Sequence, residues 1–219
     1  MKNYYKDLKL TKSEIEDNKH REVVGGLWEE IGKLQFDFLV SKGLKPEYSL
    51  LDVGCGALRG GIPFINYLNK GNYYGIDINQ YLIEAGKREL EKAGLLDKQP
   101  NFLVNEGFQF DLFSRKFDFA IAQSVFTHLP LNVIHRCLVN IEKSLKKGGK
   151  FFVTFFESDD KFNLEGISQC RDVITFLDRD PYHYHYSVFP YLIEGLPLKI
   201  EYIGDWKHPR NQKMLCFSK

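Results

Sequence analysis

Residues 50–61 read LLDVGCGALRGG, and this stretch decides the fold that the sequence predicts. The apolar run at residues 49–53 is typical of a short buried strand. Gly54 and Gly56 follow directly, and glycine lets the backbone approach a ligand without interference from a Cβ atom. A helical pattern begins shortly afterwards, so its unpaired N–H groups face the turn. Alone, the stretch fits either a tight strand-to-helix turn or a ligand-binding loop.

The next predicted strand, residues 72–78, carries a carboxylate near its end. Asp77 lies 23 residues after Gly54, and a carboxylate at the tip of an adjacent strand can bind both hydroxyls of a ribose. This pair fits a dinucleotide or S-adenosylmethionine. A dinucleotide fingerprint requires a glycine where Arg59 stands. Asp52 would repel a pyrophosphate but attract an ammonium group, so the second ligand is favoured.

Apolar strands alternate with amphipathic helices along the rest of the chain. This alternation predicts an α/β fold with a doubly wound, mostly parallel sheet. The last two strands, residues 198–203 and 214–217, are joined by a stretch too short for a crossover helix, so we expect an antiparallel last strand. The other expected strands are residues 101–104, 117–123 and 150–156, and the expected helices are residues 63–68, 80–93, 131–145 (ended by Gly148-Gly149) and 187–195.

Four motifs occur in a fixed order along the chain. They are LLDVGCGALRGG (50–61), YYGIDIN (73–79), FDFAIAQSVFTHLP (117–130) and LKKGGKFFVTFF (145–156). Together they resemble the motif set of class I S-adenosylmethionine-dependent methyltransferases. The resemblance covers residues 46–219 and implies a Rossmann-like core with a seven-stranded sheet, a reversed last strand and methyltransferase activity.

The resemblance implies the cofactor-binding residues of the first motif. Asp52, Gly54 and Gly56 match the positions that hold the methionine portion of S-adenosylmethionine. Arg59 is a further candidate, because its guanidinium could pair with the carboxylate of the cofactor. A solvated surface arginine is the alternative for Arg59.

The later motifs supply the other cofactor positions that the resemblance implies. Asp77 would bind the ribose hydroxyls, and Ile78 would pack on the adenine ring. Glu106, within residues 105–107, matches the position near the adenine amino group. Gln123, at the end of the fourth strand, would line the cofactor near the reacting sulfonium.

Methyl transfer needs a base only when the acceptor loses a proton. His128 is the candidate, because it follows the fourth strand at the carboxyl edge, where open α/β sheets bind ligands, and imidazole titrates near neutrality. A structural or helix-capping role is the alternative. The cofactor is already activated and the protein mainly supplies proximity and alignment, so the sequence indicates the cofactor site more clearly than the catalytic residues.

Candidate acceptor residues lie in an aromatic run near the C-terminus. Residues 180–186 read DPYHYHY, and we expect His183, Tyr184 and His185 to line an acceptor pocket. A packed aromatic loop is the alternative, and a metal site is not expected because two histidines lack a third ligand. The loop at residues 205–210 (DWKHPR) connects the last two strands, and it fits a position either at the opposite rim of the sheet or over the pocket.

The N-terminal segment, residues 1–45, precedes this core within a single domain. Apolar side chains recur at three- and four-residue steps over residues 20–42, which predicts one continuous helix; the polar residues 1–19 fray or form a short helix. Related methyltransferases place a lid before the core, so we expect this segment to cover the cofactor pocket and Trp28 to contact the substrate.

Composition limits the partners that the chain can have. The net charge of the 219-residue chain is +1, with 30 Lys+Arg against 29 Asp+Glu, so no basic field favours nucleic acid. No apolar run approaches a membrane span or a signal peptide. The four cysteines are far apart, which is typical of free thiols in the cytoplasm.

The sequence therefore predicts a cytoplasmic enzyme that methylates a small molecule, such as a glycan or a secondary metabolite. A methyltransferase acting on RNA or protein and a non-catalytic S-adenosylmethionine-binding protein are the alternatives. Oligomeric state is left open.

Overall fold

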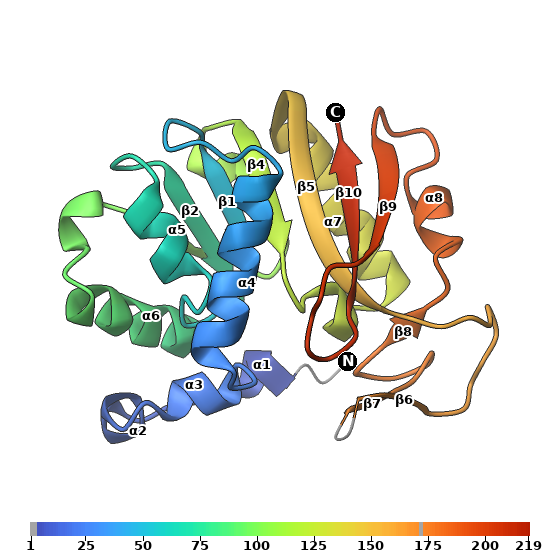
Figure 1. Cartoon of the computed structure of the whole chain (residues 1–219), viewed down its shortest axis with the longest axis horizontal. Helices are drawn as coiled ribbons and strands as arrows, with labels where there is room; N and C mark the ends of the chain where they lie inside the picture. The colour runs from blue at the N-terminus through green and yellow to red at the C-terminus, as the bar shows by residue number, and fades with distance from the viewer. Residues whose placement is uncertain (1–3, 171–172) are drawn as a thin grey trace. The chain divides into compact units, whose positions relative to one another are not determined.

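The computed structural model describes residues 4–170 and 173–219 (Figure 1). The chain forms two compact units, residues 1–106 and residues 107–219. The predicted N-terminal segment, residues 1–45, falls within the range of the first unit.

The first unit contains a parallel sheet of three strands. In the order β3-β2-β1, the strands are Asn101–Val104, Tyr73–Asp77 and Leu50–Val53. Val53 pairs with Ile76, and Asp77 pairs with Val104. Because parallel strands end at the same edge, this register brings the turn after β1 close to Asp77. The helices that follow β1 and β2 are α5 (Gly61–Tyr67) and α6 (Gln80–Lys92), and the 3-10 turn η1 (Leu96–Lys98) leads into β3.

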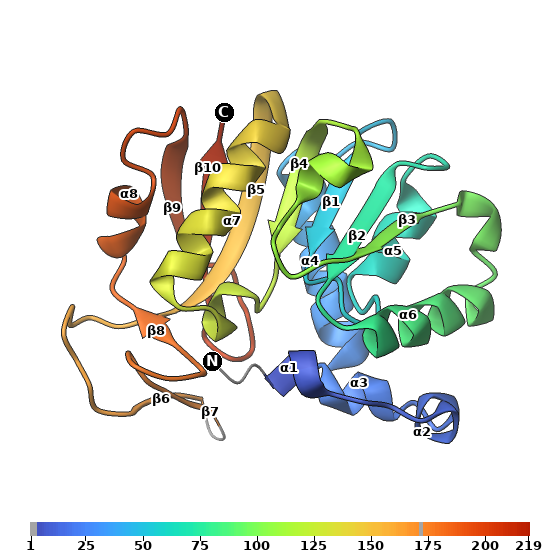
Figure 2. The ribbon, with the colours of Figure 1, turned by 180° about the vertical axis from the view of Figure 1, so that it is seen from behind.

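Within residues 4–49, four helices precede β1. They are α1 (Tyr4–Asp7), α2 (Lys12–Glu16), α3 (Lys19–Val23) and α4 (Trp28–Ser41). The prediction of one helix over residues 20–42 is therefore wrong at its start. Gly25, Gly26 and Leu27 have φ values of 96°, 59° and 46°, and left-handed residues end a helix. Helix α4 lies with α5 over one face of β1 and β2, in front in Figure 1 and behind in Figure 2.

The second unit contains a mixed sheet. In the order β4-β5-β10-β9, the strands are Phe117–Ala122, Leu145–Glu157, Lys213–Ser218 and Lys199–Asp205. Strand β4 is parallel to β5, and β10 is antiparallel to both β5 and β9. The predicted antiparallel last strand is thus confirmed. Helix α7 covers one face of β5 and β10 (Figures 1 and 2), and the other helical elements are η2, η3 and α8, at Phe110–Phe113, Phe126–His128 and Val188–Leu192.

Two features of the second unit differ from the sequence prediction. Helix α7 (Leu131–Ser144) ends before Gly148-Gly149, so these glycines do not stop it but lie inside β5. A Cβ atom on Gly149 would lie 2.9 Å from the carbonyl oxygen of Phe117, which explains the glycine where β5 approaches β4. The segment between β5 and α8 also contains three short unpredicted strands, β6 (Ile167–Cys170), β7 (Val173–Thr175) and β8 (His183–Tyr184).

Phenylalanine fills the core of the second unit and accounts for much of the aromatic content. Phe126, Phe151, Phe155, Phe189 and Phe217 have no exposed surface. The rings of Phe155 and Phe189 lie 4.7 Å apart in an edge-to-face arrangement, which favours tight packing between β5 and α8.

Candidate functional site

The glycine turn (residues 54–57) joins β1 to the helix region and exposes backbone groups. Gly54 and Gly56 have φ values of 70° and 53°, which other residues adopt only with strain. The backbone N–H groups of Gly54 and Cys55 donate to the carbonyl oxygen of Ile76, at 2.7 and 3.1 Å. Gly54 is exposed and Gly56 half-buried, so a ligand can approach the turn closely.

Asp77 lies at the end of β2, beside this turn. One carboxylate oxygen accepts from the N–H of Gly56 and the other from the N–H of Asn79, each at 2.8 Å. The side chain is buried, and burial raises the pKa of Asp77 although both of these hydrogen bonds lower it. Ile78 is half-buried next to it, as an apolar surface for a ring would be.

Asp52 is a second buried carboxylate in the first unit. It accepts a hydrogen bond from the hydroxyl of Tyr73 at 2.6 Å. Burial, together with the charge of the nearby Asp77, raises its pKa to about 7, although the hydrogen bond from Tyr73 and the charge of Arg59 oppose the shift. Two buried carboxylates with raised pKa values favour a cationic ligand. S-adenosylmethionine fits, because it carries an ammonium and a sulfonium, and its ribose hydroxyls can donate to a carboxylate.

The other two predicted cofactor residues of the first unit contact the N-terminal residues. The Arg59 guanidinium, which is nearly buried, donates to the carbonyl oxygen of Gly26 at 2.8 Å. The carboxylate of Glu106 is mostly exposed and pairs with the ammonium group of Lys6 at 2.6 Å. Their predicted roles toward the cofactor stay predictions.

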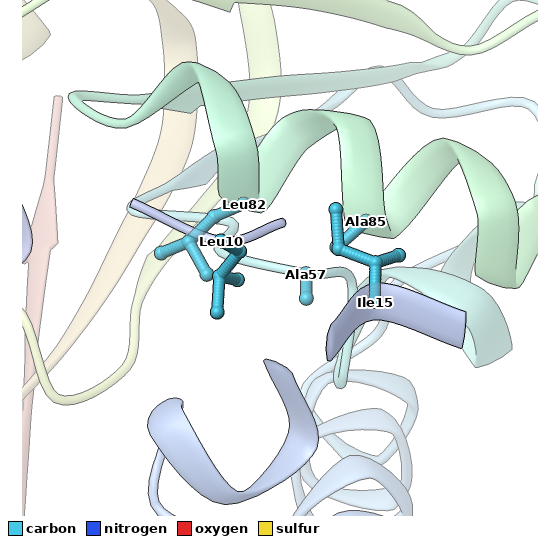
Figure 3. Close-up of a cluster of buried hydrophobic side chains, with 5 residues drawn as sticks. All are labelled: Leu10, Ile15, Ala57, Leu82 and Ala85. Atoms are coloured by element: carbon cyan, nitrogen blue, oxygen red, sulfur yellow. The ribbon is translucent and has the colours of Figure 1, made fainter. Parts of the chain in front are cut away.

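We call residues 4–27 the N-terminal arm, and its apolar side chains pack beside the glycine turn. Leu10 and Ile15 form one buried cluster with Ala57 of the turn and with Leu82 and Ala85 of α6 (Figure 3). Trp28, at the start of α4, packs against the same cluster. Its predicted contact with a substrate stays a prediction.

His128 and Asp180 form a contact pair in the second unit. His128 lies in η3, just beyond the carboxyl end of β4, and its Nδ1 is 2.5 Å from a carboxylate oxygen of Asp180. The two side chains are 26% and 29% exposed, so solutes can reach the pair. A carboxylate on one ring nitrogen fixes the tautomer and the orientation of the imidazole. The sequence had indicated His128 but gave no role to Asp180.

Gln123, at the end of β4, belongs to a buried polar network. Its side-chain amide lies 3.1 Å from Nε2 of His208, so the 205–210 loop reaches the carboxyl end of β4. The neighbouring Ser124 is bonded to Gln212 and Thr154. These partners were not predicted, because isolated polar residues in a turn-rich stretch show no pattern that points to a distant strand.

The three predicted acceptor residues in the aromatic run, residues 180–186, do not share one environment. His183 has no exposed surface, and its ring nitrogens contact the Thr175 hydroxyl at 3.0 Å and the Asn163 carbonyl at 3.1 Å. Tyr184 is also buried, and its hydroxyl donates to the carbonyl of Leu129 at 2.8 Å. These contacts favour the packed-loop alternative for both residues.

His185 differs from its two neighbours in the run, because it is only half-buried. Its Nδ1 lies 2.8 Å from the hydroxyl of Ser187. Of the three predicted acceptor residues of this run, it is therefore the one with substantial exposed surface. Across residues 4–170 and 173–219, no group of three His, Cys, Asp or Glu side chains could hold a metal ion.

The sequence of the chain is similar to those of known methyltransferases. Residues 51–151 match a family model described as a methyltransferase domain. Sterol 24-C-methyltransferase ERG6B of Gibberella zeae is 29% identical over 129 residues, which are 59% of this chain and 33% of that protein. The chain thus spans about a third of the length of this curated relative.

Solved structures share the fold. Magnesium protoporphyrin IX methyltransferase from Synechocystis, with S-adenosylmethionine bound, has a TM-score of 0.62 at 15% identity, over 96% of this chain and 85% of that one. An S-adenosylmethionine-dependent methyltransferase from Clostridium acetobutylicum has a TM-score of 0.65 at 13% identity, over 94% and 98%.

These matches confirm the predicted fold class, a doubly wound, mostly parallel sheet with an antiparallel last strand. They also confirm the resemblance that the four motifs indicated. Residues 51–151 therefore match a methyltransferase domain, and a solved structure that shares the fold has S-adenosylmethionine bound.

Proposed function

We propose that this chain transfers the methyl group of S-adenosylmethionine to an oxygen or nitrogen atom of a small molecule. The contact between His128 and Asp180 carries the proposal, because an oriented imidazole is suited to take a proton from a hydroxyl or amine. The relative and the solved structure named above act, by their names, on a sterol and on magnesium protoporphyrin IX. Both names support a small acceptor, and a glycan or secondary metabolite fits the same class.

The first unit would hold the cofactor. Asp52 and the glycine turn would take the methionine portion, and Asp77 and Ile78 the adenosine portion, with Glu106 near the adenine. Arg59 is proposed for the cofactor carboxylate and Gln123 for the region near the sulfonium. When bound, the cofactor supplies a methyl carbon activated by the positive sulfur, so the protein needs to align the reactants rather than activate the methyl group.

His128 would act as the base. The imidazole would take the proton of the acceptor hydroxyl or amine, and the acceptor lone pair would then be free to bond to the methyl carbon that the cofactor supplies, with the sulfur as leaving group. Asp180 would orient the ring and stabilise the imidazolium that results. His185 and Trp28 stay proposed acceptor contacts, whereas the internal hydrogen bonds of His183 and Tyr184 favour structural roles.

The helix content and the charge of the chain bear on its cellular location and its partners. No helix in the described part of the chain is long and apolar enough to cross a membrane. We propose a cytoplasmic enzyme that acts without nucleic-acid or membrane partners, in keeping with the balanced charge of the sequence.

The test has two steps. Calorimetry with S-adenosylmethionine and S-adenosylhomocysteine measures whether the purified chain binds the cofactor at all. A screen with tritiated methyl donor against a metabolite extract, and in parallel against RNA and protein fractions, then identifies the acceptor class. Label in small molecules supports the proposal. Label only in RNA or protein, or binding without any transfer, would support one of the two alternatives.

A further inference from the structure

A buried ionic cluster anchors the N-terminal arm to α6. Glu89, on α6, is only 4% exposed. Its carboxylate contacts Nε2 of His20 at 2.7 Å and accepts two hydrogen bonds from the Arg21 guanidinium, at 3.0 and 2.6 Å. Both partners come from α3 in the arm. Burial alone would raise the pKa of Glu89, but the bonds from Arg21 and His20 outweigh burial and lower the pKa.

The cluster is closely packed. The Arg21 guanidinium lies over the Trp28 ring, 4.7 Å from its centroid, and His20 meets the edge of the same ring. His20 has no exposed surface. A buried carboxylate that loses such partners is strongly destabilised, so we expect Glu89 to hold α3 in one position.

The arm needs such an anchor. Its helices α1, α2 and α3 contain four, five and five residues. Helices of this length are not stable alone in water and depend on tertiary contacts. The arm therefore keeps its position only while its docking contacts hold.

The docked arm touches the predicted cofactor site at several points. The side-chain amide of Asn79, two residues after Asp77, donates to the carbonyl oxygens of Tyr5 and Leu8 at 2.6 and 2.8 Å. Lys6 pairs with Glu106. These contacts lie at or next to Asp77 and Glu106, the residues proposed to bind the adenosine portion of the cofactor.

The methionine side is contacted as well. Arg59 donates to the carbonyl of Gly26, and Leu10 packs with Ala57 in the cluster of Figure 3. A Cβ atom on Gly56 would lie 3.4 Å from a methyl carbon of Val24, so the arm passes close to the turn itself. A cofactor bound at this edge would lie next to the arm, so its exchange would depend on how firmly the arm is held.

We propose that Glu89 is a positioning residue for the cofactor site. Through His20 and Arg21 it holds the N-terminal arm over the glycine turn and Asp77, and so sets the rate at which cofactor and product enter and leave. The inference rests on the cofactor part of the proposed function and is independent of the acceptor.

The experiment compares Glu89→Gln with Glu91→Gln in the full chain. Glu91 is exposed on the same helix, so it controls for the loss of one negative charge on α6. Release of tritiated S-adenosylhomocysteine is followed by rapid filtration, and hydrogen exchange is measured over residues 4–27. We expect Glu89→Gln to accelerate the release of S-adenosylhomocysteine about tenfold, which corresponds to about 1.4 kcal/mol. Hydrogen exchange should become faster in the arm and stay unchanged in β1 and β2. Glu91→Gln should match the wild type.

A second variant keeps the test decisive if Glu89→Gln does not fold. Arg21→Gln removes two of the hydrogen bonds to Glu89 at a side chain that is 35% exposed, and it should produce the same changes. Faster exchange in the arm without faster release would overturn the proposal, and so would unchanged exchange in both variants. If the wild type does not bind S-adenosylhomocysteine, the cofactor assignment itself fails and the proposal falls with it.

Discussion

The carboxylate of Asp77 accepts a hydrogen bond from the backbone N–H of Gly56 at 2.8 Å, across 21 positions of sequence. The bond joins the end of β2 to the turn that follows β1. The group proposed for the ribose therefore also holds the backbone proposed for the methionine portion. A change at Asp77 would disturb both halves of the cofactor site.

Asp77→Ala should weaken the binding of S-adenosylmethionine by about 2–4 kcal/mol, because hydrogen bonds to a charged group are lost. Calorimetry on the folded variant measures the loss. Asp97→Ala, at an exposed carboxylate in η1 of the same unit, is the matched control and should leave the affinity unchanged. An Asp77→Ala variant that binds as tightly as the wild type would remove Asp77 from the site.

Cofactor affinity should rise as the pH increases from 6 to 7.5. The pKa of Asp52 in the folded protein is about 7, mainly because of burial, so the carboxyl loses its proton over this range and can then attract the ammonium of the cofactor. Calorimetry at several pH values gives the profile. Asp52→Asn should flatten it, and a slope that survives this substitution would assign the titration to another group.

In the cofactor-free protein, the loss of the Asp52 proton should lower the free energy of unfolding. The folded pKa of Asp52, about 7, lies above the ~3.9 of an unfolded carboxyl, so between these values the native state binds more protons than the unfolded state. The contribution of Asp52 to stability should therefore be fully present below pH 4 and be lost as the pH rises through 7. Urea denaturation of wild type and Asp52→Asn at pH 5.5 and 8 measures the difference.

The sequence predicted the fold well where periodicity was strong. The strand at residues 101–104 matches β3, and the helix at residues 80–93 matches α6 to within one residue. The N-terminal helix failed, because its apolar spacing runs through Gly25 and Gly26 without a break, whereas their backbone conformation ends α3. Periodicity shows which face of a helix is apolar, but it does not detect a single turn that interrupts the helix.

The candidate site was predictable where a motif lies on consecutive residues. The glycine turn and Asp77 were found because the turn directly follows one apolar strand and Asp77 lies at the end of the next. Asp180 and His208 were not, because their partners His128 and Gln123 lie far away in sequence and come close only through the path of the loops. His183 was judged an acceptor residue by its neighbours in sequence, although its surroundings in the fold are buried.

His183 and His185 should therefore behave differently on substitution. His183→Ala removes a buried ring with two hydrogen bonds and should lower the free energy of unfolding by about 2–4 kcal/mol. His185→Ala, at a half-buried ring, should cost less than about 1 kcal/mol. Urea denaturation monitors both. A His183→Ala variant with unchanged stability and lost turnover would return His183 to the acceptor site.

Asp180→Asn should lower turnover about 10–100-fold while the affinity for S-adenosylmethionine stays within twofold of the wild type, since the carboxylate acts on the base and not on the cofactor. His128→Ala should lose at least as much, and the double variant should lose little more than His128→Ala, because two groups that act as a unit are not additive. Steady-state kinetics with the acceptor from the methyl screen measures these effects.

Asp178→Asn is the matched control for the pair. Its carboxylate is 56% exposed and pairs with the neighbouring Arg179, so the substitution removes the same charge two residues from Asp180. Turnover should stay at the wild-type level. If Asp178→Asn and Asp180→Asn reduced turnover equally, the general negative charge of this loop would matter rather than the contact with His128. If Asp180→Asn lowered cofactor affinity as much as turnover, the pair would have a structural role, because a base that acts only on the acceptor cannot change the binding of the methyl donor.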